Sequence, residues 1–103
     1  KLLSEGRTAF ASTSHPDMQT DNWLSTHKVK QTIRVGSSLK FCLLASGEAD
    51  YYPRFGQTME WDTAAGDAIL RAAGGATYSS DNLPFQYGKP AYKNTAFIAK
   101  AQP

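Results

Sequence analysis

Two acidic residues flank a tryptophan just past the middle of this 103-residue chain, in the segment Glu60-Trp61-Asp62. Asp62 stands where a helix is expected to begin, and two interpretations are open. Aspartate is a preferred N-cap, because its carboxylate accepts a hydrogen bond from a first-turn N–H group and complements the helix dipole. A carboxylate at such a position can instead bind a metal ion or line a phosphate site. Gly66 favours a second role for this turn, since a glycine inside a helix costs about 1 kcal/mol relative to alanine and lets another backbone or a ligand come close.

A second group of polar residues joins a predicted strand to a predicted helix. Ser37 and Ser38 follow Gly36, where the exposed amides of a helix N-terminus can bind an anion. An ordinary serine N-cap is the simpler alternative. Lys40 lies in the first helical turn, where a cation opposes the dipole, and a bound phosphate would reverse that disadvantage. A solvated lysine is the other interpretation.

Other candidate side chains stand alone in the sequence. Arg54 ends a predicted strand, and its guanidinium can bind a phosphate through two N–H groups or form a surface salt bridge. His15 lies in the loop after the first predicted strand and has no partner nearby in the sequence. His27 is expected to face solvent. Cys42, inside an apolar helix, is predicted to be a structural thiol rather than a nucleophile.

These segments resemble a known family. Residues 60–66 and 72–75 look like the second signature of the inositol-monophosphatase-like, metal-dependent phosphatases. Within that superfamily, residues 36–43 (Gly-Ser-Ser-Leu-Lys-Phe-Cys-Leu) and 49–54 (Ala-Asp-Tyr-Tyr-Pro-Arg) resemble the CysQ-type 3'(2'),5'-bisphosphate nucleotidases. The similarity extends over about residues 8–99, and the combination of motifs is more specific than any one of them.

The resemblance implies a role for several positions. Asp62 matches the family's aspartate that binds the catalytic metal ion, Mg²⁺. Glu60 matches a position that varies between subfamilies and carries little weight. The family's substrate-contacting residues fall on His15, Ser37, Lys40 and Arg54, and Ser38 matches by motif.

The family also has an N-terminal half, which carries a Gly-Asp-Glu-x-Glu segment and an Asp-Pro-Leu/Ile-Asp-Gly-Thr segment. Neither segment occurs here. Metal-assisted phosphate hydrolysis needs several carboxylates to hold Mg²⁺ and activate water, and Asp62 alone cannot supply them. The resemblance therefore implies that residues 1–103 are one domain, the C-terminal substrate-binding lobe of an enzyme that hydrolyses adenosine 3',5'-bisphosphate to AMP and phosphate. The chain alone is expected to be inactive.

Two alternatives remain. A relative acting on inositol phosphates or sugar bisphosphates is one, although Ser-Ser-Leu-Lys-Phe-Cys and Tyr-Pro-Arg-Phe-Gly match the nucleotidase version. The other is a non-catalytic nucleotide- or anion-binding module that uses Ser37, Lys40 and Arg54 without a metal. Sequence upstream of residue 1 would discriminate them, because only the enzymes need the acidic motifs.

Composition narrows the other possibilities. A net charge of +2 is too small to indicate a nucleic-acid or membrane partner, and no apolar run is long enough for a transmembrane segment. The single cysteine excludes an internal disulfide, which fits a reducing compartment. The expected location is the cytoplasm, and the family resemblance adds a peripheral association with the inner membrane.

Hydrophobic periodicity predicts alternating strands and helices, and therefore an α/β layered domain with a mostly parallel sheet flanked by helices. The resemblance implies the C-terminal half of an inositol-monophosphatase-like fold. Ligands of such sheets bind beyond the carboxyl ends of the strands, where His15, Ser37 and Arg54 are expected. Trp23, Trp61 and the tyrosines are interpreted as core or interface residues. The predicted strands are 8–12, 31–35, 49–52 (stopped by Pro53), 76–78, 85–87 and 95–99, and the predicted helices are 18–26, 39–47 and 62–73.

Overall fold

The computed structural model describes residues 7–11, 18–34, 39–56 and 58–102. The strands in this part of the chain form one five-stranded sheet in the order β2-β1-β3-β5-β4. The strands are β1 (Arg7–Ala11), β2 (Val29–Arg34), β3 (Tyr51–Arg54), β4 (Ala76–Ser79) and β5 (Phe97–Lys100).

The sheet is mixed, with one strand reversed. β1 pairs in parallel with β2 and β3, whereas β5 is antiparallel to both β3 and β4. Four strands therefore run in one direction and β5 runs against them. The prediction of an α/β domain with a mostly parallel sheet is confirmed in this form.

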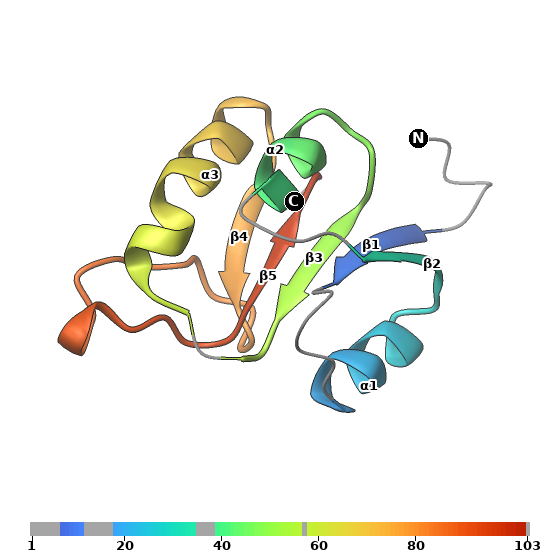
Figure 1. The fold of residues 1–103 in the computed structure, drawn as a ribbon, viewed down its shortest axis with the longest axis horizontal. Coiled ribbons are helices and arrows are strands. Elements are labelled where there is room, and N and C mark those ends of the chain that lie inside the picture. The colour runs from blue at the N-terminus through green and yellow to red at the C-terminus, as the bar shows by residue number, and fades with distance from the viewer. Residues whose placement is uncertain (1–6, 12–17, 35–38, 57, 103) are drawn as a thin grey trace.

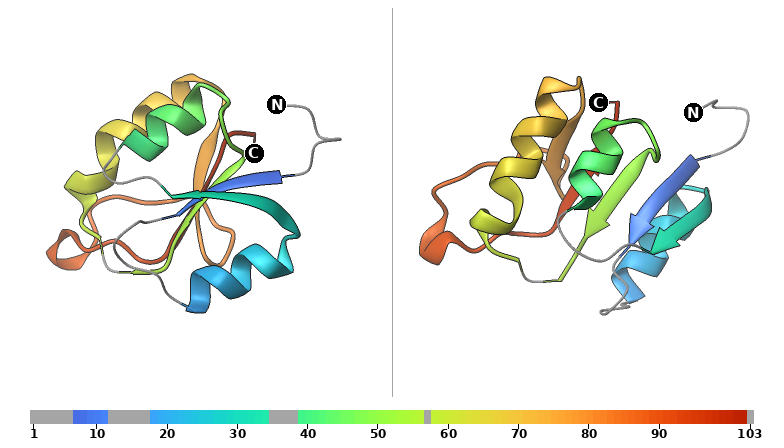
Figure 2. Two further views of the ribbon diagram at one scale, coloured as in Figure 1. Left: turned by 45° about the vertical axis from the view of Figure 1, so that its right-hand side comes forward. Right: turned by 45° about the horizontal axis from the view of Figure 1, so that its top comes forward.

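Helices cover both faces of the sheet. α2 (Leu39–Ala45) and α3 (Glu60–Ala72) pack on each other over one face, and α1 (Met18–Thr26) lies on the other face, where it contacts β2 and β3 (Figures 1 and 2). A short helical turn, η2 (Pro90–Tyr92), lies in the connection to β5. Because α1, α2 and α3 each follow a parallel strand, their N-termini lie at the carboxyl edge of the sheet.

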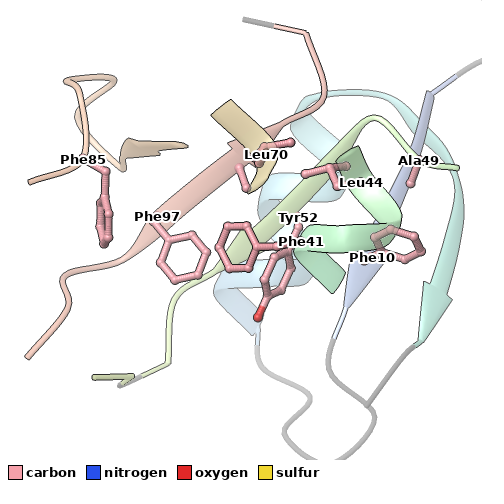
Figure 3. Packing of buried hydrophobic residues seen from close by; sticks show 9 residues of the cluster. Phe10, Phe41, Leu44, Ala49, Tyr52, Leu70, Phe85 and Phe97 are labelled. Atoms are coloured by element: carbon pink, nitrogen blue, oxygen red, sulfur yellow. The ribbon is translucent and has the colours of Figure 1, made fainter. Parts of the chain in front are cut away.

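Aromatic side chains fill the core between the sheet and the α2–α3 layer (Figure 3). Phe41 of α2 meets the Tyr52 ring edge-on at 5.4 Å and stacks on Phe97 of β5 at 5.8 Å between ring centroids. Phe85 contacts Phe97 at 5.4 Å. Such contacts add about 0.5–1.5 kcal/mol each beyond the area they bury. They tie α2 to the two strands that lie under it.

The predicted elements are found with small shifts, and two details are wrong. Pro53 was expected to stop its strand but lies inside β3. β1 reaches β3 only through the Ala9–Tyr51 pair, so the missing N–H of Pro53 falls beyond that pairing. The strand expected at 85–87 is absent from the described residues there. Pro84 forms an isolated antiparallel bridge with Tyr78, but the pairing does not continue. Phe85 instead joins the core and is 5% exposed.

The end of α3 follows from its glycines. α3 ends at Ala72, and Gly74 adopts a positive φ of 96°, which glycine tolerates better than other residues. The Gly75 N–H then donates to the Leu70 carbonyl at 2.9 Å. This is the glycine stop predicted from the sequence. Among the described residues, no helix combines the length and apolar character that crossing a membrane would require.

Candidate functional site

The alternation of β3 places two functional candidates on one face. Tyr52 and Arg54 are two residues apart, so both side chains project from the face that α2 covers, and the Arg54 side chain lies close enough to lower the pKa of Tyr52. Tyr51 projects from the opposite face, where its ring meets Trp23 of α1 at 5.1 Å. Trp23 is half-buried there and also stacks on the exposed His27 at 3.9 Å. The carboxyl end of β3 thus holds a phenol and a guanidinium together.

Lys40 joins this pair from the first turn of α2. Its side chain is among the buried residues, at 3% exposure, and its ammonium lies 5.2 Å from the centre of the Tyr52 ring. Burial lowers the pKa of Lys40, and the positive charge of Arg54 lowers it further. Two cations therefore converge on one phenol. A bound anion would relieve both the mutual repulsion and the unfavourable position of a cation at a helix N-terminus.

Tyr52 is the residue that sequence reasoning assigned simply to the core or an interface. Burial raises its pKa, and the negative charge of Asp62 raises it too, while Arg54 acts in the opposite direction. The phenol is therefore held in its protonated form, in which it can donate a hydrogen bond. Tyr52 stands two residues before Arg54 on a predicted strand end, and residues two apart on a strand share a face of the sheet. This spacing is the sequence signal that could have placed Tyr52 beside Arg54.

Asp62 lies in the first turn of α3, but it is not the N-cap. Met59 occupies that position with extended backbone angles (φ −111°, ψ 158°), and Asp62 is the third helical residue. Its Oδ2 accepts a hydrogen bond from the Met59 N–H at 2.9 Å, which is the carboxylate half of a capping box. Asp62 is exposed and lies close enough to Tyr52 to affect its pKa. The capping hypothesis is thus right about the helix terminus and wrong about the residue's place in it.

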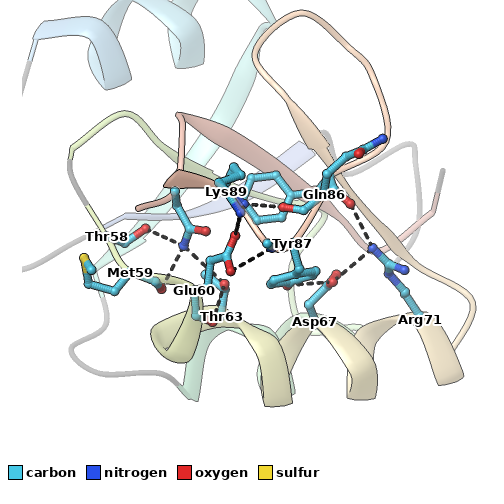
Figure 4. Close-up of polar contacts among 12 residues, drawn as sticks. Thr58, Met59, Glu60, Thr63, Asp67, Arg71, Gln86, Tyr87 and Lys89 are labelled. Atoms are coloured by element: carbon cyan, nitrogen blue, oxygen red, sulfur yellow. Dashed lines mark hydrogen bonds and ion pairs between the residues drawn. The ribbon is translucent and has the colours of Figure 1, made fainter. Parts of the chain in front are cut away.

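Glu60 takes part in a different set of contacts. Its Oε1 accepts the Gly88 N–H at 2.9 Å, and its Oε2 accepts the Lys89 N–H at 3.0 Å and pairs with the Lys89 ammonium at 2.9 Å (Figure 4). The same ammonium lies 4.4 Å from the centre of the Phe85 ring. Glu60 therefore ties the turn at 86–89 to the first turn of α3.

A second carboxylate holds the same turn two helical turns further along. Asp67 is 2% exposed and accepts hydrogen bonds from the Thr77 hydroxyl at 2.7 Å and the Tyr87 hydroxyl at 2.9 Å (Figure 4). It also pairs with Arg71 at 3.1 Å. Burial is the main cause that raises the pKa of Tyr87 to about 12. These contacts belong to the scaffold.

We expect the Glu60 contacts to make folding sensitive to acid. The Lys89 N–H is the largest of the causes that lower the pKa of Glu60 to about 2; the Lys89 side chain and the Gly88 N–H add to it, and burial opposes them. In the unfolded chain the value is about 4.3. Glu60 therefore takes up its proton at a lower pH in the folded state than in the unfolded chain. The stabilisation that its carboxylate provides is present above about pH 5 and is lost as the pH falls toward 2. Stability curves from pH 7 to 2 should be shallower for Glu60→Gln than for the wild type.

The matched variant is Lys89→Met, which removes the ammonium and keeps both backbone N–H donors. The pKa of Glu60 should then rise only part of the way to its ordinary value, as followed by carboxyl carbon shifts. A Glu60 that titrates near pH 4.3 in the folded wild type would contradict these contacts.

The structure brings some predicted site residues together and does not describe others. Lys40 and Arg54 meet at Tyr52, with Asp62 nearby. His15, Ser37 and Ser38 lie outside the described residues. Within the described part of the chain, no group of three His, Cys, Asp or Glu side chains could hold a metal ion.

The structure gives the exposure of two further side chains that the sequence analysis interpreted. Trp61 is 68% exposed, so the core alternative is wrong for it, and the interface alternative stays a prediction. Cys42 is half-buried on α2, and its role as a structural thiol stays a prediction.

Comparison with known sequences decides the family. The sequence model of the Inositol monophosphatase family matches residues 3–102. The chain belongs to this family. It is therefore related to phosphatases over nearly its whole length. The Lys40–Arg54–Asp62 edge lies in a fold of the inositol monophosphatase type.

Individual relatives agree with the family assignment. The chain is 46% identical to the 3'(2'),5'-bisphosphate nucleotidase CysQ of Buchnera aphidicola over 101 residues, which are 95% of this chain and 38% of that protein. An uncharacterized protein in the pss 5' region of Rhizobium leguminosarum is 62% identical over 68 residues, 66% of this chain and 72% of that protein. The crystal structure of CysQ from Bacteroides thetaiotaomicron superposes with a TM-score of 0.86 at 44% identity, covering 95% of this chain and 38% of that one. Against both CysQ proteins, the chain of this inositol monophosphatase family member spans well under half of the relative's length.

Proposed function

We propose that this chain is the substrate-binding lobe of a Mg²⁺-dependent 3'(2'),5'-bisphosphate nucleotidase that hydrolyses adenosine 3',5'-bisphosphate to AMP and phosphate. The convergence of Lys40 and Arg54 on Tyr52, at the carboxyl edge of the sheet and close to Asp62, is the observation that carries the proposal. The similarity to CysQ proteins supports the choice of substrate.

The proposed roles follow from charge and geometry. Lys40 and Arg54 would bind the phosphate groups of the nucleotide, Arg54 through two N–H groups and Lys40 as a point charge. Tyr52 would donate its O–H to a phosphate oxygen, and its phenol oxygen would accept an N–H of Arg54 and so hold the guanidinium in place. Because Lys40 is already desolvated, its interaction with a phosphate oxygen is stronger than that of a surface lysine. His15, Ser37 and Ser38 are proposed to complete the anion site.

Asp62 suits one position in a magnesium site. Mg²⁺ takes oxygen ligands and is often held by one or two carboxylates together with substrate phosphate and water. An exposed carboxylate in a first helical turn, near two phosphate-binding cations, fits that description. When bound, the metal supplies charge stabilisation and a more acidic water. Asp62 would supply one carboxylate oxygen to the metal ion. The remaining carboxylates would come from the N-terminal half that the family resemblance implies.

Exposed apolar side chains mark where that half would pack. Met18, Leu39 and Trp61 lie in the first turns of α1, α2 and α3 and are 78%, 58% and 68% exposed. All three helix starts lie at the carboxyl edge of the sheet, so the apolar residues border the charged candidates. Apolar side chains around a polar site are typical of a surface that another domain covers. We propose that this partner is the N-terminal half of the same protein and that nucleic acid is not a partner. We propose the cytoplasm as the location of the protein.

Two alternative functions compete with this proposal. A phosphatase of the same family acting on inositol or sugar phosphates would use the same cations, and the motifs around Lys40 and Arg54 favour the nucleotidase. A non-catalytic anion-binding module would need the cations without Asp62. Neither alternative accounts for both the CysQ similarity and the acidic residue at the start of α3.

Titration of two ligands into the isotopically labelled chain tests the substrate. AMP is expected to shift the amide signals of Lys40, Arg54 and Asp62, whereas inositol 1-phosphate shifts them much less. Equal shifts from both ligands would indicate a general anion site and would contradict the nucleotide assignment. A chain that responds to neither ligand would place substrate binding in the longer protein only.

The chain alone is expected to release no phosphate from adenosine 3',5'-bisphosphate in the presence of Mg²⁺, because Asp62 is its one proposed metal-binding carboxylate. The measurement is phosphate release from a sample of verified mass, with an Asp62→Asn sample as the blank. Release above that blank would show that residues 1–103 hold a complete catalytic site.

A further inference from the structure

The first turn of α3 is held from outside the helix by one buried amide. Asn94 is 7% exposed and lies just before β5, far from α3 in the sequence. Its Nδ2 lies 2.9 Å from the Thr58 hydroxyl oxygen, 2.8 Å from the Met59 carbonyl oxygen and 3.2 Å from the Thr63 hydroxyl oxygen. Figure 4 shows these three residues gathered at the start of the helix.

The backbone of the same segment adds two further links. The Asn94 N–H donates to the Thr58 carbonyl at 2.9 Å, and Met59 and Lys93 form an antiparallel bridge. Thr63 in turn donates its hydroxyl to the Glu60 carbonyl at 3.1 Å. The residue before the helix and the first helical turn are therefore fixed to the segment that leads into β5.

This arrangement controls Asp62 through Met59. The Met59 carbonyl accepts both the Asp62 N–H at 2.9 Å and the Asn94 amide, and the Met59 N–H donates to Asp62 Oδ2. Without the Asn94 amide, the Met59 carbonyl would lose its side-chain contact from outside the helix, and only backbone contacts, the bridge to Lys93 and the Thr58–Asn94 bond, would hold the residues that position the Asp62 carboxylate. A ligand that must be held within about 0.5 Å needs such support from neighbouring groups.

We infer that Asn94 is a positioning residue for the Asp62 carboxylate, acting through the Thr58–Met59 backbone on a metal ligand that it does not itself contact. This inference rests on the proposed role of Asp62 in metal binding. It gives the connection between β4 and β5 a part in the site.

Asn94→Ala is the direct test, and Asn22→Ala is the matched control, because it makes the same change at an exposed position on α1. Asn94→Ser, which keeps one hydroxyl donor, is the milder variant to use if the alanine variant does not fold. The amide of Leu70, near the far end of α3, reports whether the fold is intact.

Two readouts separate the inference from the proposed function. In Asn94→Ala, hydrogen exchange at Met59 and Asp62 should be about tenfold faster while that of Leu70 is unchanged. The concentration of Mn²⁺ alone that half-broadens the Asp62 signals should rise about tenfold. Asn22→Ala should change neither. Faster exchange with unchanged Mn²⁺ broadening, or unchanged exchange, would overturn the inference. If Mn²⁺ does not broaden the wild-type signals at all, the metal role of Asp62 fails, and the exchange data still show whether Asn94 positions the turn.

Discussion

Replacing Gly66 by valine is expected to lower the free energy of unfolding by about 3 kcal/mol, because the new side chain would overpack the core. A Cβ at position 66 would lie 2.6 Å from the Cβ of Phe41 and 2.8 Å from its Cγ, which is closer than such atoms normally approach. Phe41 is 2% exposed and is held between Tyr52 and Phe97, so it has no room to withdraw. In a domain of this size the melting temperature should fall by roughly 12–24 °C.

The control for this substitution is Ala65→Val in the same helical turn. Residue 65 is exposed, so valine there carries only its lower helix propensity, about 0.6 kcal/mol. A second test combines Gly66→Val with Phe41→Leu. If the two residues meet as described, the double variant should lose less stability than the sum of the single losses. Equal effects of valine at positions 65 and 66 would contradict the close approach of α2 and α3.

Replacing Lys40 by methionine is expected to weaken AMP binding by about 10- to 100-fold, because one charge-assisted contact with phosphate is lost. Methionine retains much of the volume of this buried side chain. Stability should change by less than about 1 kcal/mol, since the lost contact with the Tyr52 ring is offset by the relief of a desolvated charge beside Arg54. The measurements are AMP affinity from amide shifts and chemical denaturation.

Lys30→Met, at an exposed position on β2, is the matched control and should leave both quantities near their wild-type values. A Lys40→Met variant that binds AMP like the wild type would remove Lys40 from the proposed site. A variant that binds weakly because it has unfolded would be recognised from the denaturation curve. Arg54 can then be tested by Arg54→Lys, which keeps the charge and loses the paired N–H groups.

Local patterns accounted for most of the elements. The helix at Met18–Thr26 has the bounds that its sequence predicted, and α3 ends where Gly74 allows a positive φ. These features depend on a few adjacent residues. The edge of the sheet where Lys40 and Arg54 meet was also predictable, because strands and helices alternate and parallel strands present their carboxyl ends together.

The errors occurred where a long-range contact overrides a local preference. Pro53 continues β3 because of where β1 stops pairing, and Phe85 leaves its expected strand to contact Phe97. Neither event is visible in the neighbouring residues. The burial gained by an aromatic ring exceeds the weak preference of a three-residue segment for an edge strand.

For the candidate site, the amino-acid sequence by itself determined which residue types are present: the two cations Lys40 and Arg54, and the acid Asp62. It also determined that the two cations follow the ends of successive predicted strands. Only the tertiary structure decided that Lys40 and Arg54 converge on Tyr52, that Glu60 binds the turn at Lys89, and that Asn94 holds the start of α3. The physical reason is that Glu60 and Asn94 bind partners about 30 residues away in the sequence. Such pairs are selected by the packing of whole elements, and the local sequence carries no signal for them.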